Sequence, residues 1–200
     1  TYCDINDTIA AKSSWAATQG IFVDASAGNN KGAAGITAPA CGENVTSVGS
    51  VTKSDAISNY NTAPFMDLMA PGTSITSTIK SSSFGSKSGT SMAAPHVAGA
   101  AAVLTQYWKT AYGHAPTPAQ VRNRLKNSGT FINDTRNGIL FPRLDVFKAL
   151  QPYLNFTSTN PTNNSYLKTI ATINFTSDVN LSIALLEWNF GNGTIQNITM

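Results

Sequence analysis

Charged residues are scarce in this sequence. They make up 12% of the 200 residues, about half the usual share of roughly 25%. The thirteen lysines and arginines are scattered singly, and the formal net charge is +3. No basic stripe is therefore present of the kind that follows a phosphate backbone or an anionic membrane. We expect no nucleic acid among the partners.

Long apolar runs and metal-ligand patterns are also missing. No run approaches the ~20 apolar residues that span a bilayer, because Pro95 and His96 interrupt the small-residue stretch that follows Ser91. We therefore expect no membrane span. No metal-ligand spacing is present, and no cofactor is identifiable. The sequence lacks an initiating Met and a signal peptide, so we expect it to begin in mid-protein.

Cysteine is nearly absent, with only Cys3 and Cys41. The pair fits either one disulfide in an oxidising compartment or two buried thiols. Asn, Ser and Thr supply the polar surface in place of charge, and this composition indicates a secreted or cell-surface protein. Glycosylation stays a hypothesis. Nine N-x-[ST] sequons occur, at Asn6, Asn44, Asn133, Asn155, Asn163, Asn174, Asn180, Asn192 and Asn197.

The 42% of apolar residues is enough for a packed core, and the composition changes once, near Leu154. Before that point strands mix with helices, which indicates an α/β architecture. Beyond it, polar and apolar residues alternate over 171–176 and 179–185, as in half-buried antiparallel strands. An Asn192-Gly193 turn then predicts a hairpin. We predict one domain over 1–154 and a small antiparallel β segment or linker over 155–200.

Within the first part, apolar segments and turn residues indicate the elements. Gly20–Gly28 and Val45–Val51 read as buried parallel strands. Met69–Gly72 and Ser81–Ser86 read as turn-rich segments. The helix after Ser91 carries small and apolar residues all round, which predicts burial on most sides. Helices are expected at 91–109, 118–127 and 144–150, the second of them capped by Thr117.

The segment Ser88–Gly99 is the part of the chain that can carry chemistry. Ser91 stands at the start of a helix, after a glycine and before small residues. Its hydroxyl would lie beside unpaired backbone N–H groups at the positive end of the helix dipole. This arrangement suits a nucleophile whose own N–H receives the developing oxyanion. An ordinary N-cap serine is the alternative.

The eleven residues Gly89–Gly99 resemble the nucleophile motif of the subtilisin-like serine peptidases. Ala25–Asn29 resembles the strand that lines the primary specificity pocket of that family and ends in the oxyanion-hole Asn. Val45–Gly49 and Asp67–Gly72 agree in order and spacing, so the likeness covers about residues 15–128. The resemblance implies an α/β domain with a parallel sheet and flanking helices, of which this chain is the C-terminal part.

By the same resemblance, Ser91 is the nucleophile and Asn29 the side-chain oxyanion donor. The Asn29 amide suits that role on its own chemistry, because it donates without carrying charge, although a turn asparagine is the alternative. The resemblance further places Ser26, Ala27, Gly28 and Thr37 in the substrate pocket, with a protein or peptide as substrate. It also implies a disulfide between Cys3 and Cys41 and allows a structural calcium ion.

A general base is hard to find in this sequence. His96 lies about 140° around the helix from Ser91 and reads as a core histidine, whereas His114 would lie some 27 Å away. Lys87 reads as a solvated side chain. The resemblance implies that the family's Asp and His lie in an N-terminal segment before Thr1. We therefore expect a peptidase portion that is inactive without that segment.

Two other functions and one unusual residue remain to be considered. The Asn- and Thr-rich tail resembles immunoglobulin-like repeats, so a non-catalytic secreted or surface protein with a decayed peptidase domain is the alternative function. An α/β-hydrolase esterase fits less well, because Gly89–Ala93 lacks the second glycine of G-x-S-x-G.

Asp24 departs from the apolar strand pattern, and a buried carboxylate is costly unless it is paired or protonated.

Overall fold

Apolar segments separated by glycine-containing turns form the central sheet of the protein. In the computed structural model, residues 2–30, 35–60 and 63–151 are described, together with four short strands farther along. The parallel strands are β1 (Asp24–Ser26), β2 (Thr46–Val51), β4 (Leu68–Pro71) and β8 (Ile139–Arg143). β2 is buried at every position, as expected for a strand covered on both faces.

The strand order is β1-β2-β4-β8-β7, and β3 (Ile57–Asn59) pairs with β2. β7 (Thr130–Asp134) runs antiparallel to β8, and β3 runs antiparallel to β2. The remaining pairs are parallel. The sequence prediction of a mostly parallel sheet with flanking helices is therefore confirmed.

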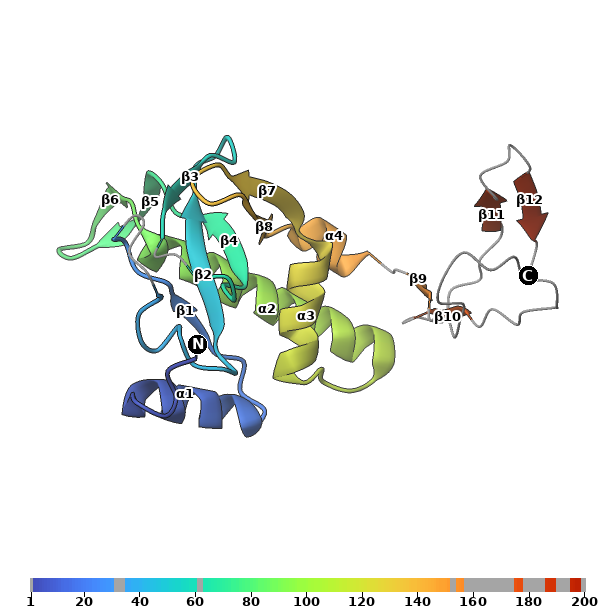
Figure 1. Cartoon of the computed structure of the whole chain (residues 1–200), viewed down its shortest axis with the longest axis horizontal. Coiled ribbons are helices and arrows are strands. Elements are labelled where there is room, and N and C mark those ends of the chain that lie inside the picture. Colours follow the sequence, from blue (N-terminus) through green and yellow to red (C-terminus); the bar gives the residue numbers. More distant parts are fainter. Residues whose placement is uncertain are drawn as a thin grey trace. The chain divides into compact units, whose positions relative to one another are not determined.

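Each face of the sheet carries its own core, because side chains alternate along each strand. In β4, Leu68 and Ala70 join one core and Met69 joins the other. The Met69 side also holds Ala10 of α1 (Thr8–Thr18). The Leu68 side holds α2 (Thr90–Tyr112) and α3 (Pro118–Ser128), with α2 running across β1, β2 and β4 (Figure 1).

Local capping explains where the helices begin and end. The Asp7 carboxylate accepts hydrogen bonds from the backbone N–H groups of Ile9 and Ala10 and so starts α1. Thr117 and Gln120 form the capping box expected at α3. α2 ends at Tyr112, and its C-cap is Gly113, whose φ of 77° suits glycine. The last helix, α4, spans Val146–Leu150, and its predicted start at 144 was two residues early.

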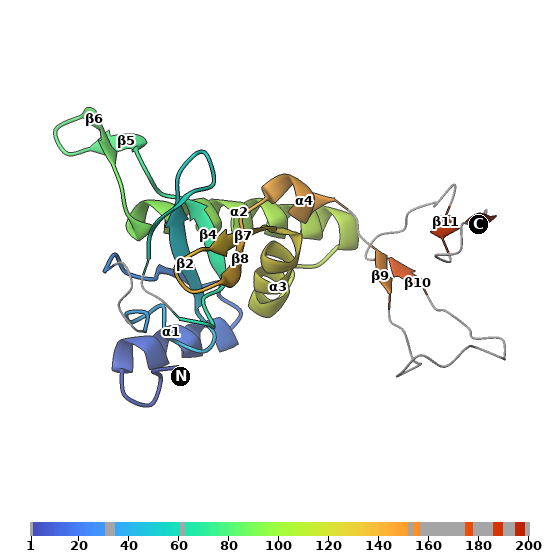
Figure 2. The same ribbon diagram turned by 45° about the horizontal axis from the view of Figure 1, so that its top comes forward.

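Two predicted turn segments are strands instead. The prediction of a turn at Met69–Gly72 was wrong, because Leu68–Pro71 forms strand β4, which is held between β2 and β8. The prediction of a turn over all of Ser81–Ser86 was also wrong, because β5 (Ile75–Ile79) and β6 (Ser83–Lys87) form an antiparallel hairpin. Only its tip is a turn, with Ser81 and Ser82 at positive φ. The hairpin projects away from the sheet and leads directly into α2 (Figure 2).

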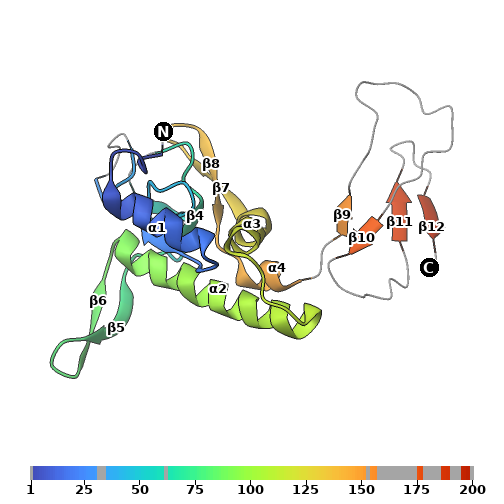
Figure 3. The same cartoon turned by 90° about the horizontal axis from the view of Figure 1, so that it is seen from below.

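Burial of α2 is one-sided, so the prediction of burial on most sides was wrong for this chain. Its buried residues recur at helical spacing and include Ala93, Val97 and Leu104. The opposite side exposes Ala98 and Val103 among other small or apolar residues. The full length of α2 is visible in Figure 3. No helix in the described part of the chain is both long and apolar enough to cross a bilayer.

Residues 151–200 form a second compact unit, separate from 1–150. The predicted boundary lay four residues later, after Leu154. Two antiparallel pairs are present, as expected for a small antiparallel segment: β9 (Leu154–Phe156) with β10 (Phe175–Ser177), and β11 (Leu186–Asn189) with β12 (Ile195–Ile198). The strand expected at 179–185 and the Asn192-Gly193 turn lie outside the described residues.

Candidate active site

The first part of the candidate site is the turn that follows β1. The N–H of Ala27 donates to the Val48 carbonyl at 2.9 Å and so holds the end of β1 against β2. Gly28 follows with φ 104°, a left-handed value that glycine adopts without steric cost. This turn directs the next residue, Asn29, to an exposed position at the carboxyl end of the strand. Ligands bind at this end of parallel sheets.

The second part is the start of α2. Gly89 is the N-cap of the helix, with φ 150° and no side-chain cap, so the interpretation of Ser91 as an N-cap is wrong. The Gly89 N–H donates to the Gly72 carbonyl at 2.8 Å, which fixes the helix start against the end of β4. Ser91 is the second helical residue and is exposed. Its hydroxyl makes no hydrogen bond to any described residue.

Thr90 joins these two parts. Oδ1 of Asn29 accepts a hydrogen bond from the Thr90 backbone N–H at 2.9 Å and another from the Thr90 hydroxyl at 3.1 Å. Two donors on one oxygen define the orientation of the amide, so Nδ2 is left to donate elsewhere. The structure thus brings Asn29 to the residue immediately before Ser91. Sequence reasoning missed Thr90, although it stands inside the quoted motif.

The predicted pocket residues lie beside this junction. The backbone N–H and the hydroxyl of Thr37 approach the Ala27 carbonyl at 3.2 and 3.4 Å. Ala27 is fully buried, Ser26 and Gly28 are half-buried, and Thr37 is exposed. The structure therefore places Thr37 against the end of β1, and its role as the floor of the pocket stays a prediction. Residues 31–34 of the intervening loop lie outside the described part.

The described residues supply no base for Ser91. His96 is exposed and its Nδ1 lies 2.8 Å from the Met92 carbonyl, so its prediction as a core histidine was wrong. The buried face of α2 passes through Val97 and not through His96. His114 lies beyond the far end of the 23-residue helix α2, about 33 Å from its start. Lys87 is exposed on β6.

The calcium ion that the resemblance allows has no assigned ligands among the residues that the structure describes. No group of three or more His, Cys, Asp or Glu side chains lies together in those ranges. Ca²⁺ takes oxygen ligands, and these include backbone and Asn or Gln carbonyls as well as carboxylates.

A sequence profile described as the subtilase family matches residues 2–174. The chain belongs to the subtilase family. Among curated relatives, subtilisin E of Bacillus subtilis (strain 168) is 40% identical over 125 residues, which cover 60% of this chain and 31% of that protein. Subtilisin of Bacillus pumilus is 39% identical over 125 residues, which cover 60% of this chain and 43% of the relative.

Solved structures of other peptidases share the subtilase fold of this chain. A prenylagaramide maturation protease, PagA, has a TM-score of 0.62 and 29% identity, covering 72% of this chain and 55% of its own. A lanthipeptide protease has a TM-score of 0.63 at 23% identity, covering 71% and 54%. This subtilase chain therefore spans about half of these structures and less than half of the two subtilisins.

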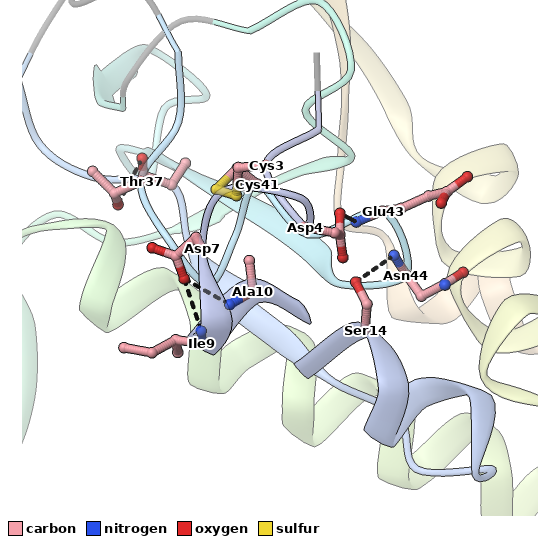
Figure 4. The surroundings of a disulfide bond; sticks show 11 residues. Cys3, Asp4, Asp7, Ile9, Ala10, Ser14, Thr37, Cys41, Glu43 and Asn44 are labelled. Carbon is pink, nitrogen blue, oxygen red and sulfur yellow. Dashed lines mark hydrogen bonds between the residues drawn. A yellow bond between two sulfur atoms is a disulfide. The ribbon is translucent and has the colours of Figure 1, made fainter. Parts of the chain in front are cut away.

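A disulfide joins the N-terminal segment of the subtilase chain to the loop that also carries Thr37. Cys3 and Cys41 are bonded with their Cα atoms 5.5 Å apart (Figure 4). The Cys3 N–H also donates to the Cys41 carbonyl at 3.1 Å. Nearby, the Ser14 hydroxyl accepts from the Asn44 N–H at 3.2 Å. These contacts anchor α1 beside the candidate pocket.

Removing this disulfide is expected to destabilise the first unit by about 4 kcal/mol. The bond links residues 38 positions apart, and closing a loop of that length restricts the unfolded chain. The double variant Cys3→Ser, Cys41→Ser should show this loss in urea unfolding at pH 7. Dithiothreitol should destabilise the native chain equally and leave the double variant unchanged. An equal midpoint for native chain and variant would contradict the expectation.

Asp24 lies half-buried on β1, next to the candidate site. Burial raises the pKa of its carboxyl to about 6, and only its own backbone N–H opposes this change. The side chain forms no ion pair with a described residue. Ionised Asp24 therefore weakens the fold of this chain.

The pH dependence of stability should reveal this cost. The folded carboxyl has a pKa of about 6 against 3.8 for the free group, so the unfolded chain releases the proton first, and stability falls between pH 4 and pH 6. Because Asp24 is partly solvated, we expect a penalty of about 1 kcal/mol. Asp24→Asn should stabilise the chain by this amount at pH 7.5 and not at pH 3.5, measured by urea unfolding. The same gain at both pH values would exclude ionisation as its cause.

Proposed function

We propose that this chain is the C-terminal part of the catalytic domain of a serine endopeptidase, with Ser91 as the nucleophile and Asn29 as the oxyanion donor. The contact of Asn29 with Thr90 is the observation that carries the proposal. It holds an oriented amide next to an exposed serine at the start of a long helix. Membership of the subtilase family supports the reaction class.

The chemistry follows from the start of α2. The first N–H groups of a helix have no partner within the helix, so the Ser91 N–H is available to a ligand. When Ser91 Oγ attacks a peptide carbonyl, the new C–O bond leaves a negative charge on the carbonyl oxygen. The Ser91 N–H and Asn29 Nδ2 can both donate to that oxygen, and the helix dipole adds to the stabilisation. Breaking the C–N bond then gives an acyl-enzyme, which water hydrolyses.

The reaction also needs a group that takes the Ser91 proton and passes it to the leaving amine. We propose that a His, oriented by an Asp, performs this step, and that both come from an N-terminal segment of the intact protein or from another chain. His96 and Lys87 are exposed and do not contact Ser91, which supports a base from outside this chain. The apolar side of α2 left uncovered here supports it as well.

Protein or peptide substrates would be held by the end of β1. Ser26, Ala27 and Gly28 would form one wall of the primary pocket, and Thr37 its floor. The small, uncharged side chains there favour a substrate side chain without negative charge. We further propose a secreted or cell-surface location, in keeping with the disulfide, and an immunoglobulin-like character for residues 155–200. A structural calcium ion belongs to the same proposal, with no ligands assigned.

A decayed, non-catalytic peptidase domain is the alternative, favoured by the absence of a base among the described residues. A fluorophosphonate probe on the intact protein separates the two, since it reacts with a serine activated by an assembled triad. Labelling at Ser91, located by mass spectrometry and lost in Ser91→Ala, supports the peptidase. An intact, folded protein that takes up no label would favour the decayed domain.

A further inference from the structure

The hairpin of β7 and β8 presents an apolar face to solvent at the end of the sheet order farthest from β1 (Figure 1). Phe131 of β7 is 60% exposed and Leu140 of β8 is 58% exposed. Ile132 and Phe141 alternate with them and pack on the other face, in the core that contains Met69. Large apolar side chains gathered on one exposed face mark a surface that a ligand or modification can cover.

Asn133 stands on this exposed face. Alternate residues of a strand share a face, so Asn133 lies beside Phe131, and the strand register places it directly opposite Leu140. Such cross-strand and diagonal neighbours are within reach of one another's side chains. Asn133 is exposed, and its side chain forms no hydrogen bond to a described residue. A free amide is therefore held between two exposed apolar side chains.

Asn133 begins an N-x-[ST] sequon, completed by Asp134 and Thr135. Thr135 is exposed, whereas Asp134 is buried on the opposite face. The Arg136 guanidinium donates to both oxygens of the Asp134 carboxylate at 2.9 and 3.1 Å. The Gly138 N–H donates to the Asp134 carbonyl at 2.7 Å and closes the turn. The fold thus turns the carboxylate inward and leaves the amide and the hydroxyl of the sequon accessible.

The other sequons lack this combination or lie beyond the described side chains. Asn6 is exposed and begins a sequon of the same three residue types, but the residue two positions before it is Asp4. Asn44 is half-buried, and Thr46 of its sequon is buried in β2. The remaining six follow residue 154, where the structure describes no side chains. Asn133 is the described sequon that joins an accessible amide to an aromatic neighbour on the same face.

We propose that Asn133 carries an N-linked glycan whose first sugar packs on Phe131 and Leu140. In the transfer, Asn133 Nδ2 forms a bond to C1 of the first sugar of a lipid-pyrophosphate-linked oligosaccharide. The C1–O bond breaks, the lipid pyrophosphate leaves with the electron pair, and Nδ2 gives up one proton. The inference rests on the proposed secreted or cell-surface location, because such glycans belong to exported proteins.

The neighbours of Asn133 give the glycan a structural effect. One face of a sugar ring presents C–H groups, and the face of the Phe131 ring carries negative partial charge, so the two can stack. Covering roughly 40 Å² of apolar surface corresponds to about a fivefold gain in the folding equilibrium constant. The sugar hydroxyls then present a polar surface to water in place of Phe131.

The first test measures occupancy. The full chain is secreted from a mammalian cell line, which supplies the transfer machinery, and its glycans are released enzymatically in water labelled with oxygen-18. Mass spectrometry then finds each occupied asparagine as a labelled aspartate. We expect Asn133 to be occupied in most molecules and Thr135→Ala to leave it vacant. A vacant Asn133 in the secreted native chain would overturn the proposal, whatever the state of Asn6.

The second test measures the contact with Phe131 through a double-mutant cycle. In urea unfolding of the secreted chain, Asn133→Gln should lower the folding equilibrium constant about fivefold. The same change in a Phe131→Thr background should have no effect. Both residues are exposed, so these variants are expected to fold. Trimming the glycan to its first sugar should preserve the gain, and Asn6→Gln, the matched control, should leave stability unchanged.

An equal loss with and without Phe131 would overturn the stacking contact, as would loss of the gain on trimming. Neither result bears on the peptidase. Fluorophosphonate labelling of Ser91 in the intact protein tests that proposal separately, because β7 lies at the opposite end of the sheet order from β1, the strand that leads to Asn29.

Discussion

Replacing Ser91 with alanine is expected to abolish peptide hydrolysis by the intact peptidase, with a loss in kcat of about a millionfold. This magnitude is the one measured when the nucleophile is removed from subtilisin, a relative of this chain, and it is carried over from that enzyme. The physical reason is that Ser91 carries the attacking hydroxyl, whereas the hydroxyls of Ser88 and Thr90 are held in hydrogen bonds with the Ser74 N–H and Asn29 Oδ1. Release of nitroaniline from a peptide anilide measures the effect.

The matched control is Ser86→Ala, which removes an exposed serine of β6 and should leave kcat unchanged. The 200-residue chain alone should show no hydrolysis above background, with or without Ser91, because its described residues supply no base for Ser91. If the isolated chain hydrolyses the anilide appreciably and Ser91→Ala abolishes this activity, the proposal that the His and Asp come from another segment or chain is wrong.

Replacing Asn29 with alanine in the intact peptidase should lower kcat by about 10²- to 10³-fold and leave KM nearly unchanged. This is the loss of about 2.7–4 kcal/mol measured when the oxyanion-hole asparagine of subtilisin is replaced. Asn29 Nδ2 would donate to an oxygen that becomes negative only in the transition state, so its removal affects kcat selectively. Steady-state kinetics on the peptide anilide give both constants.

Asn123→Ala, at an exposed position on α3, is the control for amide removal and should have no effect. Thr90→Val keeps the backbone donor to Asn29 Oδ1 and removes the hydroxyl donor. The loss in kcat should therefore be several-fold smaller than the loss in Asn29→Ala. Thr90→Ser keeps both donors and should restore the rate. A rise in KM at constant kcat in Asn29→Ala would assign Asn29 to ground-state binding.

The sequence was most informative where local chemistry determines structure. Thr117 and Gln120 specified the start of α3 because a capping box is formed by residues three apart. Val45–Val51 was recognised as a strand because its three valines are separated only by small residues, which a strand buried on both faces can pack. The family motif pointed to Ser91 and Asn29 without any knowledge of the hydrogen bonds between Asn29 and Thr90.

Other features depend on distant residues and could not be predicted. β4 contains Pro71 and precedes a glycine, so its turn-like residues concealed a strand that β2 and β8 hold in place. His96 was assigned to the core because its neighbours are apolar, but the sheet covers only one side of α2. Thr90 was missed because its partner, Asn29, is 61 residues away in sequence.

That long separation has a consequence for how the protein acquires its site. Closing a loop of 61 residues costs entropy that no local contact repays, so the amide and the helix start meet only once strand pairing has drawn the intervening chain together. Spectroscopic probes placed at these two residues would therefore report completion of folding.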